Sequence, residues 1–136
     1  MCLSVHIASA APLPVGVWNP DARAFYLEAL PEDAPVRDRF SLPFVYFAGT
    51  HLGCGCGFQK YENDSENDGE ADKTLANYTA LAGVIRDALS HSSSVEVFTC
   101  WEGDDHEPEV LESVRVSELL LPEFEFKERQ FLRVLL

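Results

Sequence analysis

The chain has 136 residues, of which 46% are hydrophobic and 11% aromatic, and 23 acidic against 10 basic residues give it a net charge of −13. Such a hydrophobic fraction is typical of a packed core, so we expect a single domain over residues 1–136. The excess of acid opposes binding to a phosphate backbone or an anionic membrane surface. No stretch reaches the ~18 consecutive apolar residues of a membrane span. We therefore expect neither a nucleic acid nor a membrane partner, and a protein partner remains open.

The first half of the chain predicts strands that are separated by proline-rich connections. Residues 2–8 alternate between apolar and polar side chains, which predicts a strand with one buried side. Prolines and glycines interrupt the pattern before residues 24–30, which predict a second strand. Residues 44–48 are apolar on both faces, which is typical of a central strand, and this strand should end at Gly49. Residues 57–61 are expected to return as its partner.

The second half predicts one helix and further strands. Apolar residues at helical spacing predict a helix over about 73–91 that lays one stripe on a sheet. Residues 95–101 are rich in β-branched and aromatic side chains and predict a strand. Weaker alternation over 113–119 and 124–127, and an apolar run over 131–136, complete the pattern. Together, these strands and the helix predict an α+β domain with a mostly antiparallel sheet of about six to eight strands and one main helix.

Two acidic stretches, 62–72 and 102–112, contain no lysine or arginine. Like charges that lie close together repel one another and stay in water unless a cation neutralises them. We expect both stretches to be solvated loops.

The segment that leaves the central strand holds the most distinctive residues of the chain. His51, Cys54 and Cys56 fall within six residues, and a glycine flanks each cysteine. Cysteines two apart on a strand lie on the same face, about 6.6 Å apart, and the glycines allow a bend that brings the sulfurs closer. Thiolates and imidazole are the preferred ligands of zinc, which binds four ligands in structural sites and three plus a water in catalytic ones.

The remaining ligand would have to come from elsewhere in the chain. Cys100 is the best candidate, because it lies near the end of a predicted strand that we expect to neighbour residues 44–48. Cys2 is the second choice. The leading hypothesis is thus a metal-binding protein, with zinc as the ion and His51, Cys54, Cys56 and Cys100 as ligands.

Other interpretations of the same residues stay open. Cys54 and Cys56 could form a strained, easily reduced disulfide and act as a thiol redox pair, although no basic residue lies nearby in sequence to lower their pKa. A cysteine nucleophile with His51 or His106 as its base lacks an ordering motif. The thiols could also be structural, in a tightly packed turn of a non-enzymatic interaction module. The sequence does not decide whether the protein is an enzyme.

Four cysteines at these spacings do not resemble the disulfide scaffold of a secreted domain, and no basic residue precedes Arg23, as a signal peptide would require. A cytoplasmic protein with reduced thiols is expected.

Three short motifs carry a resemblance to a known family. They are His-x-Gly-Cys-x-Cys-Gly-Phe at 51–58, Cys-Trp-Glu-Gly at 100–103 and Glu-Arg-Gln-Phe at 128–131. Together they resemble a family of small uncharacterised bacterial proteins. The resemblance implies a bacterial cytosolic single domain and brings no activity, cofactor or catalytic residue with it.

Overall fold

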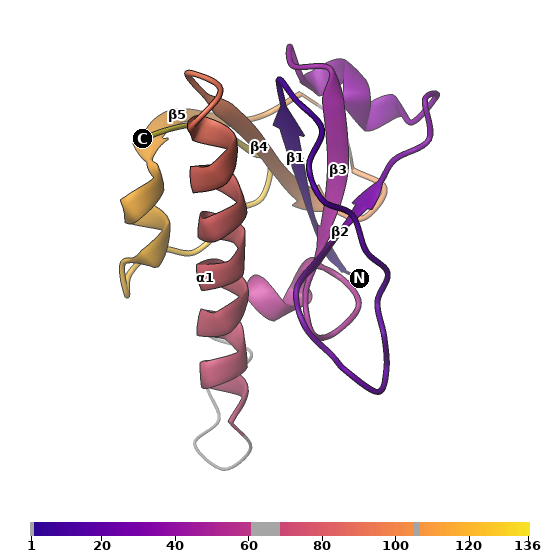
Figure 1. Cartoon of the computed structure of the whole chain (residues 1–136), viewed down its shortest axis with the longest axis vertical. Helices are drawn as coiled ribbons and strands as arrows, with labels where there is room; N and C mark the ends of the chain where they lie inside the picture. The colour runs from indigo at the N-terminus through magenta and orange to yellow at the C-terminus, as the bar shows by residue number, and fades with distance from the viewer. Residues whose placement is uncertain (1, 61–68, 105–106) are drawn as a thin grey trace.

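The computed structural model describes residues 2–60, 69–104 and 107–136. Six strands form one sheet in the order β2-β3-β1-β4-β6-β5, and one long helix crosses it (Figure 1). All neighbouring strands are antiparallel except β5 and β6, which are parallel. This arrangement confirms the predicted α+β class with a mostly antiparallel sheet. The strands are β1 (Leu3–Ser9), β2 (Tyr26–Ala29), β3 (Phe44–Gly49), β4 (Val95–Trp101), β5 (Val110–Arg115) and β6 (Gln130–Leu135).

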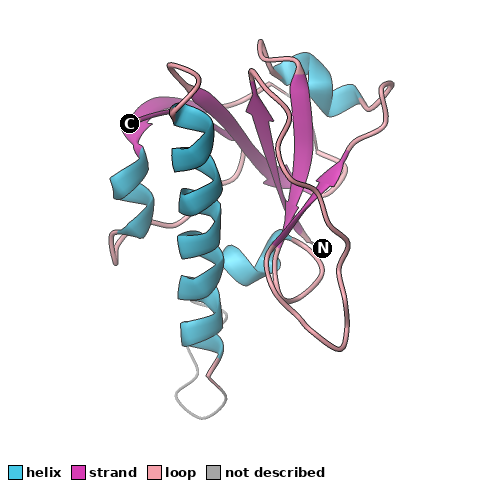
Figure 2. Cartoon of the chain, in the orientation of Figure 1, coloured by secondary structure: helices cyan, strands magenta, loops and turns pink. Residues whose placement is uncertain are grey.

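The helix α1 spans Glu70–Leu89, against the predicted 73–91, and packs along one face of the sheet (Figure 2). Its buried residues recur every three or four positions, so they form the single apolar stripe that a surface helix needs. Tyr78, Leu81 and Ile85 on this stripe are at most 1% exposed and belong to one buried hydrophobic core with side chains of β1, β4 and β6. The packing of this stripe fixes the position of α1 on the sheet.

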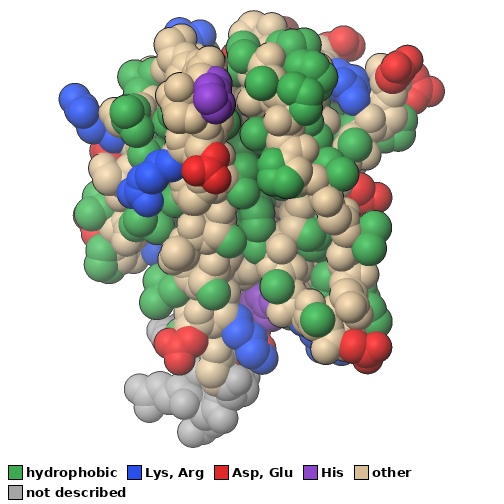
Figure 3. Space-filling model, in the orientation of Figure 1, with side chains coloured by type: hydrophobic (Ala, Val, Ile, Leu, Met, Phe, Trp, Pro, Cys, Tyr) green, Lys and Arg blue, Asp and Glu red, His purple; other side chains and the backbone are tan. Residues whose placement is uncertain are grey.

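Both faces of the sheet are covered, but by different segments. The long connection between β1 and β2 runs on the helix side, where Leu13 and Phe25 pack against the main core (Figure 1). Val15 and Val17 of this connection are exposed. Hydrophobic side chains are also visible on the surface of the molecule seen from the helix side (Figure 3). The opposite face carries a smaller core beneath the short 3-10 helix η1, Pro35–Arg39.

Three predicted strand segments have a different structure. Residues 57–60 do not return as a strand, because Gly55–Phe58 form the 3-10 helix η2, and Tyr61 lies outside the described residues. The strand predicted at 113–119 lies at Val110–Arg115, and its second half is the 3-10 helix η3, Val116–Leu120. Val116 and Leu119 are both buried, and a spacing of three suits a 3-10 turn better than a strand.

Residues 124–127 alternate like a strand but pair with no neighbour in the described sheet. Phe124 and Phe126 instead enter an aromatic cluster with Phe58 and Tyr78, with ring centroids 5.3–5.9 Å apart. Tyr78 and Phe126 are stacked and the other pairs meet edge to face. Aromatic pairs in both geometries stabilise beyond the area that they bury. The alternation of residues 124–127 therefore reflects side-chain packing and not a strand.

Within the described residues, no helix combines the length and the apolar character needed to cross a membrane.

Candidate metal centre

Thr50 organises the turn that follows β3. Its side chain is fully buried; its hydroxyl donates to the carbonyl of Cys54 at 2.6 Å and accepts the backbone N–H of Gly57 at 3.2 Å. Its backbone N–H donates to the same Cys54 carbonyl at 3.0 Å, and its own carbonyl accepts the N–H of Gly53 at 2.9 Å. A single buried threonine thus satisfies most of the backbone groups that the end of the strand leaves unpaired.

Each of the three glycines in this turn stands where a side chain would be strained or would overlap its neighbours. Gly53 has φ +82°, a conformation that side chains rarely adopt. A Cβ on Gly55 would overlap the backbone carbonyl of Leu3, and a Cβ on Gly57 would overlap the side chain of Thr50. The glycines therefore allow the turn to pack directly against the start of β1 and against itself.

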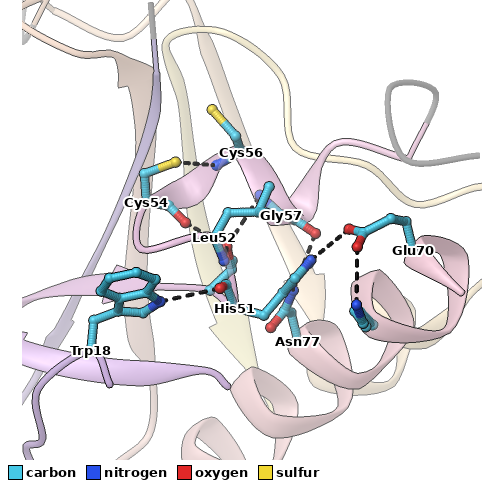
Figure 4. Close-up of polar contacts among 10 residues, drawn as sticks. Trp18, His51, Leu52, Cys54, Cys56, Gly57, Glu70 and Asn77 are labelled. Carbon is cyan, nitrogen blue, oxygen red and sulfur yellow. Dashed lines mark hydrogen bonds and ion pairs between the residues drawn. The ribbon is translucent and has the colours of Figure 1, made fainter. Parts of the chain in front are cut away.

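This close approach brings three thiols together. The sulfur atoms of Cys2, Cys54 and Cys56 all lie within 4.8 Å of one another, and each of the three residues is half-buried. The backbone N–H of Leu3 donates to Sγ of Cys56 at 3.4 Å, and the N–H of Cys56 donates to Sγ of Cys54 at 3.5 Å (Figure 4). None of the four cysteines is in a disulfide. We call Cys2, Cys54 and Cys56 the thiol cluster.

The environment of the cluster keeps the Cys54 thiol protonated. Burial raises the pKa of Cys54 to about 12. The backbone N–H of Cys56 opposes this shift, while side-chain hydrogen bonds with Cys56 and Cys2 and the charge of Cys56 add to it. Loss of a proton from this sulfur would leave a partly buried negative charge with two further thiols beside it. A bound cation would favour the thiolate over the thiol, because its positive charge stabilises the negative charge on the sulfur.

His51 faces away from the thiol cluster, toward the first turns of α1 (Figure 4). Its Nε2 lies 2.7 Å from Oε2 of Glu70, and its Nδ1 lies 2.9 Å from Nδ2 of Asn77. The Asn77 amide also donates to the Gly57 carbonyl at 3.2 Å. This second bond fixes the orientation of the amide, since the flipped amide would place its oxygen against another carbonyl oxygen.

The orientation of Asn77 determines the tautomer of His51. Because the amide nitrogen donates to Nδ1, Nδ1 must be the unprotonated nitrogen, and Nε2 carries the proton that is donated to Glu70. The bond from His51 is the main cause that lowers the pKa of the Glu70 carboxyl, and Lys73 at 3.2 Å contributes as well. His51, Asn77 and Glu70 therefore join the turn to α1.

Cys100 does not belong to the thiol cluster. It belongs to β4, opposite Ser4 of β1, and is 2% exposed in the smaller core with Val36 and Phe98. The next residue, Trp101, points to the helix side, where it packs against the main core. Successive strand residues alternate between faces, so Cys100 and Trp101 belong to different cores. The Cys100 sulfur is outside the group of thiols that lie within 4.8 Å of one another.

Of the four residues predicted as ligands, the structure thus brings Cys54 and Cys56 together, while His51 and Cys100 lie outside the group of thiols within 4.8 Å. It adds Cys2, the second choice from the sequence. Cys2 is brought there by the antiparallel pairing of β1 with β3, in which Val5 lies opposite Ala48. This pairing places the start of β1 beside the end of β3, from which the turn departs.

Comparison with protein-family models, with curated proteins and with solved structures found no match to the chain. The resemblance to small bacterial proteins accordingly stays a prediction.

Proposed function

We propose that the protein binds a thiophilic metal ion through Cys2, Cys54 and Cys56, and that zinc is the ion. The mutual approach of the three sulfurs within 4.8 Å carries this proposal. Two Zn–S bonds of ~2.3 Å at a tetrahedral angle hold their sulfurs roughly 3.8 Å apart, so the cluster needs only a small contraction. A water molecule would take the fourth position.

The surroundings of the cluster support a metal–thiolate site. Backbone N–H groups of Leu3 and Cys56 already donate to two of the sulfurs, and such donors stabilise the negative charge on a thiolate. The ligands come from two segments far apart in the sequence, so a bound ion would also join the start of β1 to the turn. Metal binding is then coupled to stability.

The redox alternative needs a reactive thiolate in the absence of a metal. With the pKa of Cys54 at about 12, only a very small fraction of this thiol is ionised at neutral pH. Because three thiols, and not only the Cys54–Cys56 pair, approach one another, and because Cys54 is a poor nucleophile, we favour metal binding over a dithiol exchanger. We also place the protein in the cytoplasm, where thiols stay reduced.

The test is the metal content of the protein purified without chelator, measured by elemental analysis. We expect near-stoichiometric zinc in the natural chain and its loss in Cys2→Ser, Cys54→Ser and Cys56→Ser. Cys100→Ser and His51→Gln serve as controls, with circular dichroism to verify folding, and they should retain zinc.

The outcome also separates the alternatives. Loss of zinc in Cys100→Ser and His51→Gln, with retention in Cys2→Ser, would replace the proposed ligands by the set predicted from the sequence. An absence of metal together with a reversible Cys54–Cys56 disulfide would support the redox protein. Inert reduced thiols without metal would leave an interaction module with structural cysteines.

A further inference from the structure

The number of sulfur ligands in the thiol cluster bears on which ions it can hold. Among the described residues, Cys2, Cys54 and Cys56 are the only group of three or more histidine, cysteine or acidic side chains whose ligand atoms lie within 4.8 Å of one another. Zinc in such a site takes its fourth ligand from solvent. A trivalent ion with a stereochemically active lone pair requires only three sulfurs and no further ligand.

The net charge of the complex favours the same class of ion. Three thiolates and a divalent cation leave one negative charge in a partly buried site, whereas three thiolates and a trivalent centre are neutral. The chain already carries a net charge of −13. Moving an uncompensated charge out of water is costly, so the neutral complex suits this location best.

The cluster is also accessible and pre-organised. All three cysteines are half-buried, so part of each residue is in contact with solvent. The contact of Gly55 with Leu3 holds the two segments together in the absence of an ion. Little conformational freedom is then lost when the three sulfurs bind one atom.

We infer that the thiol cluster binds trivalent arsenic as a three-coordinate complex. Arsenic is a soft, thiophilic centre that matches an all-sulfur ligand set. One molecule of arsenous acid, As(OH)3, condenses with three thiols. Three As–O bonds break and three As–S bonds form, and each thiol proton leaves with a hydroxyl as water. Arsenic remains trivalent, and no electrons are transferred.

This inference rests on the thiol cluster proposed above and extends it from zinc to a second class of ion. The experiment adds arsenite to the full chain, reduced with a phosphine and freed of metal, and records the intact mass under native conditions. We expect a single adduct whose mass equals one arsenic atom minus three hydrogens. Ultraviolet absorption from As–S bonds should increase in parallel and reach a plateau at one equivalent.

Cys2→Ser, Cys54→Ser and Cys56→Ser should each lose the three-hydrogen adduct, and Cys100→Ser, with one thiol fewer elsewhere, should keep it. If a serine variant does not fold, protection of the natural chain provides the second measurement. Arsenite should shield three cysteines, but not Cys100, from a maleimide added after brief denaturation.

Zinc binding at the cluster without an arsenic adduct would overturn this inference and leave the proposed function intact. Persistence of the three-hydrogen adduct in Cys2→Ser would also overturn it, because only two of the proposed sulfurs would remain in this variant. If neither zinc nor arsenite binds, both the proposed function and this inference fail.

Discussion

Gly55 lies so close to the backbone carbonyl of Leu3 that no side chain fits between them. This contact joins the turn after β3 to the start of β1, and it sets the approach of Cys2 to Cys54 and Cys56. The stability of the domain and the geometry of the thiol cluster therefore depend on the same position.

Gly55→Ala should destabilise the protein and move the Cys2 sulfur away from those of Cys54 and Cys56. Overpacking against backbone costs about 1–3 kcal/mol, because the turn or the strand must move to admit the methyl group. The measurement is urea unfolding together with zinc affinity. Gly83→Ala is the matched control, since a Cβ at this helical position meets nothing within 4 Å, and it should stabilise the protein by up to about 1 kcal/mol. Equal stability of the two variants would contradict the assigned contact.

The His51–Glu70 pair should contribute stability that is lost in acid. The bond from His51 lowers the pKa of Glu70, so the folded state favours the ionised carboxyl. This contribution is fully present above the unfolded pKa of about 4.3 and disappears as the pH falls through the lower folded pKa. Glu70→Gln should therefore have a lower melting temperature than the natural chain at pH 7, and the difference should shrink on acidification.

Asp72→Asn is the control for that experiment, because it removes one negative charge from the same turn of α1 without touching the bond to His51. A difference for Glu70→Gln that stays constant down to the acid limit would show that the carboxylate does not act through its charge.

Asn77 should hold His51 in one tautomer. Asn77→Leu leaves Nδ1 of His51 and the carbonyl of Gly57 without their donor, which we expect to cost about 2 kcal/mol. Nitrogen-15 spectra of the natural chain should show a protonated Nε2 and an unprotonated Nδ1. In the variant this tautomer preference should weaken. Thr79→Ala, on the exposed side of the same helix, should change stability by less than about 0.5 kcal/mol.

Alkylation should report the suppressed ionisation of Cys54. An unshifted thiol approaches its full reaction rate above about pH 8.5. Because burial raises the pKa of Cys54 to about 12, its rate with iodoacetamide should still be rising at pH 10. Peptide mass spectrometry measures the rate, and the urea-unfolded chain supplies the reference. A plateau in the folded chain at the pH seen in urea would refute the assigned environment.

The sequence by itself determined the elements with strong local patterns. The apolar spacing of α1, the alternation of β1 and the β-branched run of β4 predict their elements because each pattern repeats within a few residues. The α+β class follows from their order. The closeness of Cys54 and Cys56 also follows from the chain alone, since only Gly55 separates them in the sequence.

Only the tertiary structure decided which residues complete the site. Cys2 joins the cluster through the antiparallel pairing of β1 with β3. Cys100 lies outside it, because β1 separates β4 from β3 and the Cys100 side chain is buried in the smaller core with Val36 and Phe98. His51 is engaged by Asn77 and Glu70, which α1 brings from a distant part of the chain. These partners depend on strand register and on the position of α1, and both arise from contacts between residues far apart in the sequence.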